Sequence, residues 1–298
     1  MKLRVLGCSG GIGGSQSRTT SFLVDDDILV DCGTGVGDLP LEVLSRIDHV
    51  FLTHAHLDHI AALPLLIDSV GELRSKPLLV HATPETIRIL HSHIFNWLVW
   101  PDFSAIPDQH QPFMRFQPMM VGEHVDLRGR RITALPARHT VPAVAFCLDS
   151  GSGQLVFSGD TAYCPELIDA INAQPQLRHL ILETAFADEQ HGLALASRHL
   201  CPSMSLTVLA ELNVAPVVHI SHLILETAFA DEQHGLALAS RHLCPSMSLT
   251  VLAELNVAPV VHISHLKPGG SSRIMEELRA GLPVLALRRL EQGDVLEF

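Results

Sequence analysis

Long hydrophobic runs are missing from this chain of 298 residues. No stretch of about eighteen consecutive apolar residues occurs, so the sequence predicts no transmembrane helix. The N-terminal segment turns glycine-rich at Gly7, before the apolar core of a signal peptide could form. We therefore expect a cytoplasmic protein without a membrane partner.

Positive charge and paired cysteines are also scarce. Lys and Arg total 20 against 32 Asp and Glu, which gives a formal net charge of −12. Because binding to a long nucleic acid depends on neutralising many phosphates, this balance argues against such a partner, although a small anion held by metal ions is allowed. The cysteines lack CxxC spacing, and we interpret them as small buried thiols rather than a disulfide framework.

Apolar residues, in contrast, make up 47% of the chain, and charged residues 17%. A chain of this length and composition can bury a sizeable core. One large α/β domain over residues 1–298 is therefore expected rather than two small ones.

Four metal-capable side chains are concentrated in residues 52–60, Leu-Thr-His-Ala-His-Leu-Asp-His-Ile. Residues 50–52 predict the end of a buried strand and residues 60–63 the start of a helix, so the stretch between them is a strand-to-helix turn. Imidazoles with a carboxylate suit Zn²⁺, Mn²⁺ or Fe²⁺ better than Ca²⁺ or Mg²⁺, and ligands this close in sequence can serve two adjacent ions. The candidate ligands are His54, His56, Asp58 and His59.

Two later strands also end in metal-capable residues. Residues 131–135 predict a strand that leads to His139, for which a structural role is the alternative. Residues 155–157 predict a buried strand followed by a tight turn that presents Asp160. Asp160 fits a bridging ligand, because a carboxylate has two oxygens and can hold two ions at once.

The order His-x-His-x-Asp-His at residues 54–59 resembles the signature of the metallo-β-lactamase superfamily. The resemblance implies hydrolysis and an α/β fold, a four-layer αββα sandwich with two mixed sheets and the metal site at the sheet edges. It implies that His139 is a third metal histidine and that a later strand ends in a last one. It also implies that Asp31 orients a ligating histidine, for which a simple turn aspartate is the alternative.

Both tryptophans of this aromatic-poor chain lie within residues 96–103, Asn-Trp-Leu-Val-Trp-Pro-Asp-Phe. This segment resembles the class II cyclic-nucleotide phosphodiesterases, a branch of the superfamily. The resemblance implies that Asn96, Trp97 and Trp100 contact the substrate, and a hydrophobic helix end capped by Pro101 is the alternative. The chain departs from the class pattern at Ala62, where glycine or serine is expected.

Residues 179–221, which we term copy one, recur without a change as residues 222–264, copy two. Stacked repeats diverge because each position has different neighbours, so a perfect copy in an otherwise unrepetitive chain indicates a recent duplication rather than a repeat fold. Each copy holds an expected strand, a helical segment and a second strand. The superfamily core needs one such unit.

The duplication makes part of the predicted site ambiguous. The last superfamily ligand is expected at His265, with His222 as its double, because the residues after His265 are unique and the sheet reaches them by a short connection. Copy one is then expected to be looped out or added at a sheet edge. A resemblance to ribonuclease Z implies that a glutamate and a histidine protonate the leaving group, with capping or core packing as the alternative. We assign Glu183 and His242, whose doubles are Glu226 and His199.

The sequence thus predicts a phosphodiesterase that hydrolyses 3′,5′-cyclic nucleotides, cAMP or cGMP, to 5′-nucleotides. Its expected cofactors are two divalent metal ions, with Zn²⁺ favoured over Mn²⁺ or Fe²⁺. These ions lower the pKa of a bound water and so give hydroxide at neutral pH. The predicted metal ligands are His54, His56 and His139 for one ion, Asp58, His59 and His265 for the other, and Asp160 between them. The predicted catalytic residues are Asp58, Asp160, Glu183 and His242.

Three alternatives are left open. A ribonuclease Z-like nuclease is opposed by the acidic balance and by the lack of a basic, Gly/Pro-rich arm for tRNA. A thioester or lactone hydrolase is a second alternative, and inactivation by the duplication is a third. The expected partner is a small-molecule substrate, a cyclic nucleotide, and a homodimer is not excluded.

Overall fold

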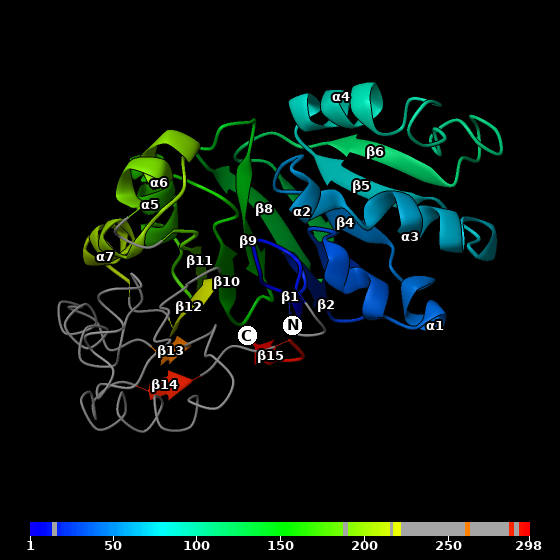
Figure 1. Ribbon diagram of the computed structural model, residues 1–298. Coiled ribbons are helices and arrows are strands. Elements are labelled where there is room, and N and C mark those ends of the chain that lie inside the picture. The colour runs from blue at the N-terminus through cyan, green and yellow to red at the C-terminus, as the bar shows by residue number, and fades with distance from the viewer. Residues whose placement is uncertain (14–16, 187–189, 215–216, 222–259, 263–285, 289–291) are drawn as a thin grey trace. The chain divides into compact units, whose positions relative to one another are not determined.

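The computed structural model describes residues 1–13, 17–186, 190–214, 217–221, 260–262, 286–288 and 292–298 (Figure 1). Contacts divide the chain into two compact units. Unit 1 comprises Met1–Pro136, Thr140–Gly151 and Gln292–Phe298, and unit 2 comprises Ala137–His139 and Ser152–Glu291. The single domain expected over residues 1–298 stays a prediction. Among the described residues, no helix is long and apolar enough to cross a membrane.

The larger sheet of unit 1 has seven strands in the order β15-β1-β2-β3-β4-β5-β6 (Figure 1). The expected hairpin is present, because β2 and β3 pair antiparallel around Asp25–Asp27. From β3 to β6 the neighbours are parallel, so each connection must cross over the sheet. The strands are β1 (Lys2–Gly7), β2 (Ser21–Val24), β3 (Ile28–Val30), β4 (His49–Phe51), β5 (Leu78–Ala82), β6 (Met114–Pro118) and β15 (Val295–Glu297).

Short helices make these crossovers. In α3 (Leu63–Val70) the buried residues recur at spacings of three and four, which places them on one face of a helix. In α4 the side chain of Thr83 caps the first turn by accepting from the Thr86 N–H. The remaining helices of unit 1 are η1 (Thr34–Asp38), α1 (Leu41–Leu44), α2 (Leu57–Ile60), η2 (Gly71–Leu73) and α4 (Pro84–His93).

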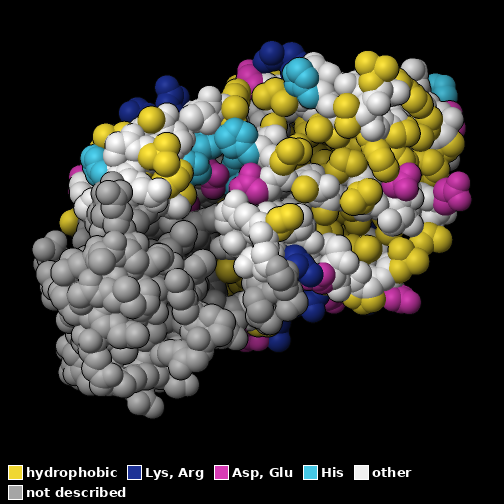
Figure 2. Space-filling model, in the orientation of Figure 1, with side chains coloured by type: hydrophobic (Ala, Val, Ile, Leu, Met, Phe, Trp, Pro, Cys, Tyr) yellow, Lys and Arg dark blue, Asp and Glu magenta, His cyan; other side chains and the backbone are white. Residues whose placement is uncertain are grey.

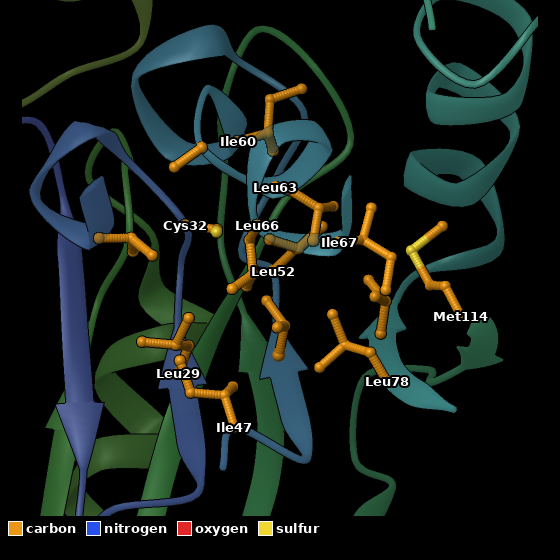
Figure 3. Close-up of a cluster of buried hydrophobic side chains, with 14 of the residues drawn as sticks. Leu29, Cys32, Ile47, Leu52, Ile60, Leu63, Leu66, Ile67, Leu78 and Met114 are labelled. Atoms are coloured by element: carbon orange, nitrogen blue, oxygen red, sulfur yellow. The ribbon is translucent and has the colours of Figure 1, made fainter. Parts of the chain in front are cut away.

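A hydrophobic cluster fills the space between the parallel strands and α3 (Figure 3). Leu29, Leu52 and Leu78 come from the strands or their ends, and Leu63 and Ile67 come from the helix. All five side chains are fully buried, and burial of each contributes roughly 1.5–3 kcal/mol relative to exposure. The cluster therefore fixes the C-terminal end of β4, from which the candidate site begins.

Three antiparallel strands complete unit 1. They are β7 (His124–Leu127), β8 (Arg130–Pro136) and β9 (Val144–Asp149), paired in that order. Phe146 of β9 meets the ring of Phe51 edge-on, with 5.7 Å between the centroids. The N–H of Val144 donates to the carbonyl of Thr53 at 3.0 Å, so β9 contacts the chain two positions after the end of β4.

Unit 2 carries a parallel arrangement. Strand β11 pairs with β10 on one side and with β12 on the other, while β13 pairs with β14. Strands β11 and β12 and the helices between them belong to copy one. The described part of copy two is strand β13. The elements are β10 (Gln154–Phe157), α5 (Pro165–Asn172), β11 (Leu177–Glu183), α6 (His191–Ser197), α7 (Pro202–Ala210), β12 (Val217–Ser221), β13 (Val260–His262) and β14 (Ala286–Arg288).

Candidate metal centre

The first candidate group lies on the segment 53–59 between β4 and the end of α2, which we term the metal turn. His54 and His59 are fully buried, and His56 is the residue that precedes the first turn of α2. The N–H of Cys32 donates to the carbonyl of His59 at 2.7 Å. At Gly33 an added Cβ would lie 2.5 Å from the carbonyl oxygen of Asp58. A residue without a side chain is therefore required where the metal turn packs against the end of β3.

Asp31 binds the metal turn through its buried carboxylate. Its Oδ2 accepts from Nδ1 of His59 at 2.7 Å, and its Oδ1 accepts from the N–H of Thr53 at 2.8 Å. Burial raises the pKa of the Asp31 carboxyl, and the contact with His59 opposes that rise. Because a carboxylate that accepts from Nδ1 fixes the orientation of the ring, Asp31 positions His59 and is more than a turn residue.

The hydrogen bonds of the metal turn favour Nε2 as the coordinating nitrogen. Nδ1 of His59 donates to a carboxylate, so the lone pair lies on Nε2, 3.5 Å from Oδ2 of Asp58. Nδ1 of His54 lies 3.0 Å from Oγ1 of Thr53, and ligand nitrogens of His54 and His56 lie within 4.8 Å of each other. Converging imidazole nitrogens with one carboxylate fit a divalent ion of the Zn²⁺ type.

The second candidate group lies in unit 2. Asp160 follows β10 and the turn at Gly159, which has a φ of 57°. Nε2 of His139 lies 4.0 Å from Oδ2 of Asp160, and both side chains are buried. Nδ1 of His139 donates to the carbonyl of Arg198 at 3.0 Å, which again leaves the lone pair on Nε2. This pair fits the same class of metal ion as the metal turn.

Glu183, which is buried, and the partly buried His199 form a pair beside Asp160. Oε1 of Glu183 accepts from the N–H of Thr161 at 3.1 Å and from Nδ1 of His199 at 2.9 Å. Nδ1 of His199 is also 4.0 Å from Oδ2 of Asp160. Burial raises the pKa of Glu183 to about 7, and the hydrogen bond from His199 opposes that rise. Among the described residues, Oε2 of Glu183 has no hydrogen-bond partner.

The predicted substrate residues belong to the segment 94–100 after α4, which we term the α4 loop. Nδ2 of Asn96 donates to the carbonyl of Ser92, and its Oδ1 accepts from the N–H groups of Leu98 and Val99. The Asn96 side chain therefore shapes the loop. Trp97 is 61% exposed, whereas Trp100 packs against the hydrophobic cluster. Their roles toward a substrate stay predictions.

The α4 loop lies where hydrophobic side chains gather on the surface of unit 1, over α3 and α4 (Figure 2). Leu98 at the tip of the loop is 91% exposed.

His91 and His93 lie on α4, two positions apart. Side chains at this spacing on a helix do not face each other, so these two histidines do not form a ligand pair.

Each unit thus gathers part of the predicted ligand set. Unit 1 brings together the predicted ligands His54, His56, Asp58 and His59. Unit 2 brings together the predicted ligands His139 and Asp160, with the predicted catalytic residue Glu183 beside Asp160. The predicted ligand His265 and the predicted catalytic residue His242 lie outside the described residues. The histidine beside Glu183 is His199, the double of His242. The assignment missed it, although Glu183 and His199 belong to the same copy.

The sequence is similar to hydrolases of one family. A family model described as Beta-lactamase superfamily domain matches residues 26–286. A ribonuclease Z of Bradyrhizobium diazoefficiens is 30% identical over 145 residues, which cover 46% of this chain and 46% of that protein. A probable 3′,5′-cyclic-nucleotide phosphodiesterase of Yersinia pestis is 25% identical over 252 residues, which cover 70% of this chain and 71% of that protein. The chain thus spans less than half of the ribonuclease Z relative.

Two solved structures share the fold. The metallo-beta-lactamase fold protein YhfI of Bacillus subtilis has a TM-score of 0.63 at 19% identity, covering 100% of this chain and 98% of that one. Yeast PDE1, crystallised without a ligand, has a TM-score of 0.67 at 17% identity, covering 100% of this chain and 99% of that one. At such identities the likeness concerns the fold alone. The predicted fold class, an α/β sandwich of the metallo-β-lactamase type, is confirmed.

Proposed function

This chain belongs to the beta-lactamase superfamily, and from that premise we propose that it is a metal-dependent phosphodiesterase that opens 3′,5′-cyclic nucleotides to 5′-nucleotides. The observation that carries the metal-dependent part is the donor chemistry of the two groups. His59 and His139 each have Nδ1 held by an acceptor, so that Nε2 carries the lone pair. The substrate class rests on the relative from Yersinia pestis and on the class II segment at residues 96–103.

The ligand set predicted from the sequence would hold two divalent ions. In that assignment one ion would take His54, His56 and His139, the other Asp58 and His59, and both would share Asp160. Bound ions supply positive charge for the attacking and leaving oxygens of an in-line displacement and lower the pKa of a bound water to about 7. Asp31 and the carbonyl of Arg198 keep the ligating rings in place.

Glu183 and His199 supply the proton that the leaving group needs. Hydroxide adds to phosphorus, the bond from phosphorus to the 3′ oxygen breaks, and that oxygen takes a proton from Nε2 of His199. Oε1 of Glu183 accepts from Nδ1 of His199 and so stabilises the charged ring before the transfer. The proton lost by water restores the pair.

A ribonuclease Z-like activity is the second candidate, because a relative of that name is 30% identical over part of the chain. The formal charge of −12 opposes a polyanionic substrate. A small diester needs few positive contacts and is compatible with this charge.

The test compares substrates on metal-loaded protein. We expect turnover of cAMP or cGMP and of bis(p-nitrophenyl) phosphate, with 5′-nucleotide as the product from the cyclic substrate. A precursor tRNA and a thioester are expected to be inert. Turnover of the thioester or the tRNA without turnover of any cyclic nucleotide would contradict the proposal.

Asp160→Ala provides the link between metal and activity. Loss of the bridging carboxylate should remove bound metal and turnover together. Asp169→Ala, an exposed position on α5, is the matched control and should change neither. Two ions per chain with near-normal turnover in Asp160→Ala would refute the bridging role.

A further inference from the structure

The two identical copies cannot occupy one place beside the candidate site, and the contacts of the described residues distinguish them. We propose that copy one, residues 179–221, is the working copy, and that copy two is an insertion that the site does not need. This inference concerns the site of the proposed function but rests on contacts that do not depend on the substrate.

The strand positions give the first observation. In β11, which copy one supplies, Leu180 and Ile181 pair in parallel register with Val156 and Phe157 of β10. On its other side β11 pairs with β12, also from copy one, up to Glu183 opposite Ser221. The strand of copy two, β13, pairs with β14 instead. Copy one thus supplies β11, which pairs with the unique strand β10, and also its other neighbour β12. The sequence analysis had expected copy one to be looped out or added at a sheet edge.

A contact with His139 gives the second observation. Nη1 of Arg198 donates to the carbonyl of His139 at 2.7 Å, and the carbonyl of Arg198 accepts from Nδ1 of the same histidine at 3.0 Å. His139 occurs outside the duplicated segments, so only one copy can make this reciprocal contact at a time. Here it is made by Arg198, whose double in copy two is Arg241.

The turn that presents Asp160 is also held by copy one. The N–H of Glu183 donates to Oγ of Ser158 at 3.0 Å, and its Oε1 accepts from the N–H of Thr161. Both partners lie in the unique part of the chain, on either side of Asp160. Copy one therefore fixes the backbone that carries this carboxylate.

A surface clamp gives the fourth observation. Oη of Tyr163, the one tyrosine of the sequence, lies 2.8 Å from both carboxylate oxygens of Glu211. Nδ2 of Asn172 donates to the carbonyl of Glu211 at 3.0 Å, and its Oδ1 accepts from the N–H of Asn213 at 2.6 Å. Two unique residues thus bind the end of α7 in copy one. Glu254 is the double of Glu211 and serves as its control.

These contacts assign roles that differ between the copies. Arg198 and Glu211 are positioning residues, the first for His139 and the second for the segment that follows Asp160. Removing 43 residues as one copy gives the same 255-residue sequence whichever copy is deleted. That shortened chain retains every residue named in these contacts and should form the same site.

The decisive experiment compares, in the full chain, substitutions at Arg198 and Glu211 of copy one with the same substitutions at Arg241 and Glu254 of copy two. Arg198→Ala removes the donor to the His139 carbonyl and keeps the backbone carbonyl that accepts from the His139 ring. It should raise the Mn²⁺ concentration for half-maximal binding about 10-fold, the low end for loss of a contact that supports a metal ligand. Arg198→Lys, which keeps a donor, should recover part of that loss. Glu211→Ala should lower Tm by about 2–4 °C. Arg241→Ala and Glu254→Ala should match the parent in Mn²⁺ binding and in Tm.

The shortened chain is the second arm. We expect it to bind Mn²⁺ and unfold within about 2 °C of the parent. Equal effects in both members of a pair, larger effects in copy two, or a shortened chain that fails to bind Mn²⁺ would each overturn the inference. Because Mn²⁺ binding and Tm need no substrate, these results stand apart from a failure to hydrolyse cyclic nucleotides.

Discussion

At the scale of single residues, Asp31 has the clearest separable role. Asp31→Asn replaces a carboxylate that accepts from both His59 and Thr53 with an amide that can accept at one atom. We expect the affinity for a divalent metal to fall about 10–100-fold, measured by titration with Zn²⁺ or Mn²⁺. Asp68→Asn, on the exposed side of α3, should bind metal as the parent does. Unchanged affinity in Asp31→Asn would show that other contacts hold His59.

His81 makes the stability of the chain depend on pH. Its ring stacks on Phe51 with 4.3 Å between the centroids, and its Nε2 lies 3.0 Å from Nδ1 of His49. Burial lowers the pKa of His81 to about 3, and His49 adds to that effect. In the unfolded chain the pKa of histidine is about 6.5, so between these values the unfolded chain binds more protons. The free energy of unfolding therefore falls as the pH drops through this window.

His81→Asn should reduce this pH dependence. One ring that stays neutral in the fold contributes a slope of up to about 1.4 kcal/mol per pH unit, and the variant lacks that contribution. Urea unfolding from about pH 7 down to about pH 4 measures the slope. His93→Asn, an exposed position on α4, is the control. The same slope in His81→Asn as in the parent would mean that other groups cause the dependence.

At the scale of elements, the two tryptophans of the α4 loop have different environments, which the sequence could not distinguish. Trp100 packs against the hydrophobic cluster. Trp100→Ala should therefore lower the free energy of unfolding by about 2 kcal/mol and lower Tm by several degrees. Trp97 is exposed, so Trp97→Ala should leave Tm unchanged. If its indole stacks on a base, a contact worth ~1–3 kcal/mol, KM should rise for cyclic nucleotides and not for bis(p-nitrophenyl) phosphate. Equal KM changes for both substrates would exclude stacking.

The elements that carry the candidate ligands were predictable because their signals are local. A strand end, a short turn and a helix start fall within residues 50–63, so His54 and His59 could be placed on one turn from the sequence. The support from Asp31 required the resemblance, since Asp31 and His59 come from different elements. The shape that Asn96 gives to its loop was not foreseen, because an asparagine that bonds its own backbone looks the same in sequence as one that binds a ligand.

At the scale of the whole molecule, the fold followed from a recognised signature, whereas the use of the duplicated segments did not. Identical sequences have identical propensities, so no local rule separates His199 from His242. The prediction relied on the short connection after copy two. The connection before copy one, from α5 into β11, is also short, and the described contacts are those of copy one.

Metal binding should stabilise the whole chain, because an ion that binds the folded form and not the unfolded form shifts the equilibrium. At a concentration of 100 times Kd the gain is about 2.7 kcal/mol, which corresponds to a rise in Tm of roughly 5–10 °C. Thermal unfolding with Zn²⁺, with Mn²⁺ and with a chelator measures it. The same Tm in all three conditions would contradict the proposed metal binding.

Arg198 occupies a left-handed backbone position, with a φ of 54°, at the end of α6. Glycine is the residue that most often ends a helix in this conformation, since it has no Cβ to strain. A search for more heat-resistant variants would therefore select Arg198→Gly, and the same substitution would remove the side-chain donor to the His139 carbonyl. Selection for stability and selection for turnover act in opposite directions at this position, so an engineer should keep it fixed while improving the rest of the chain.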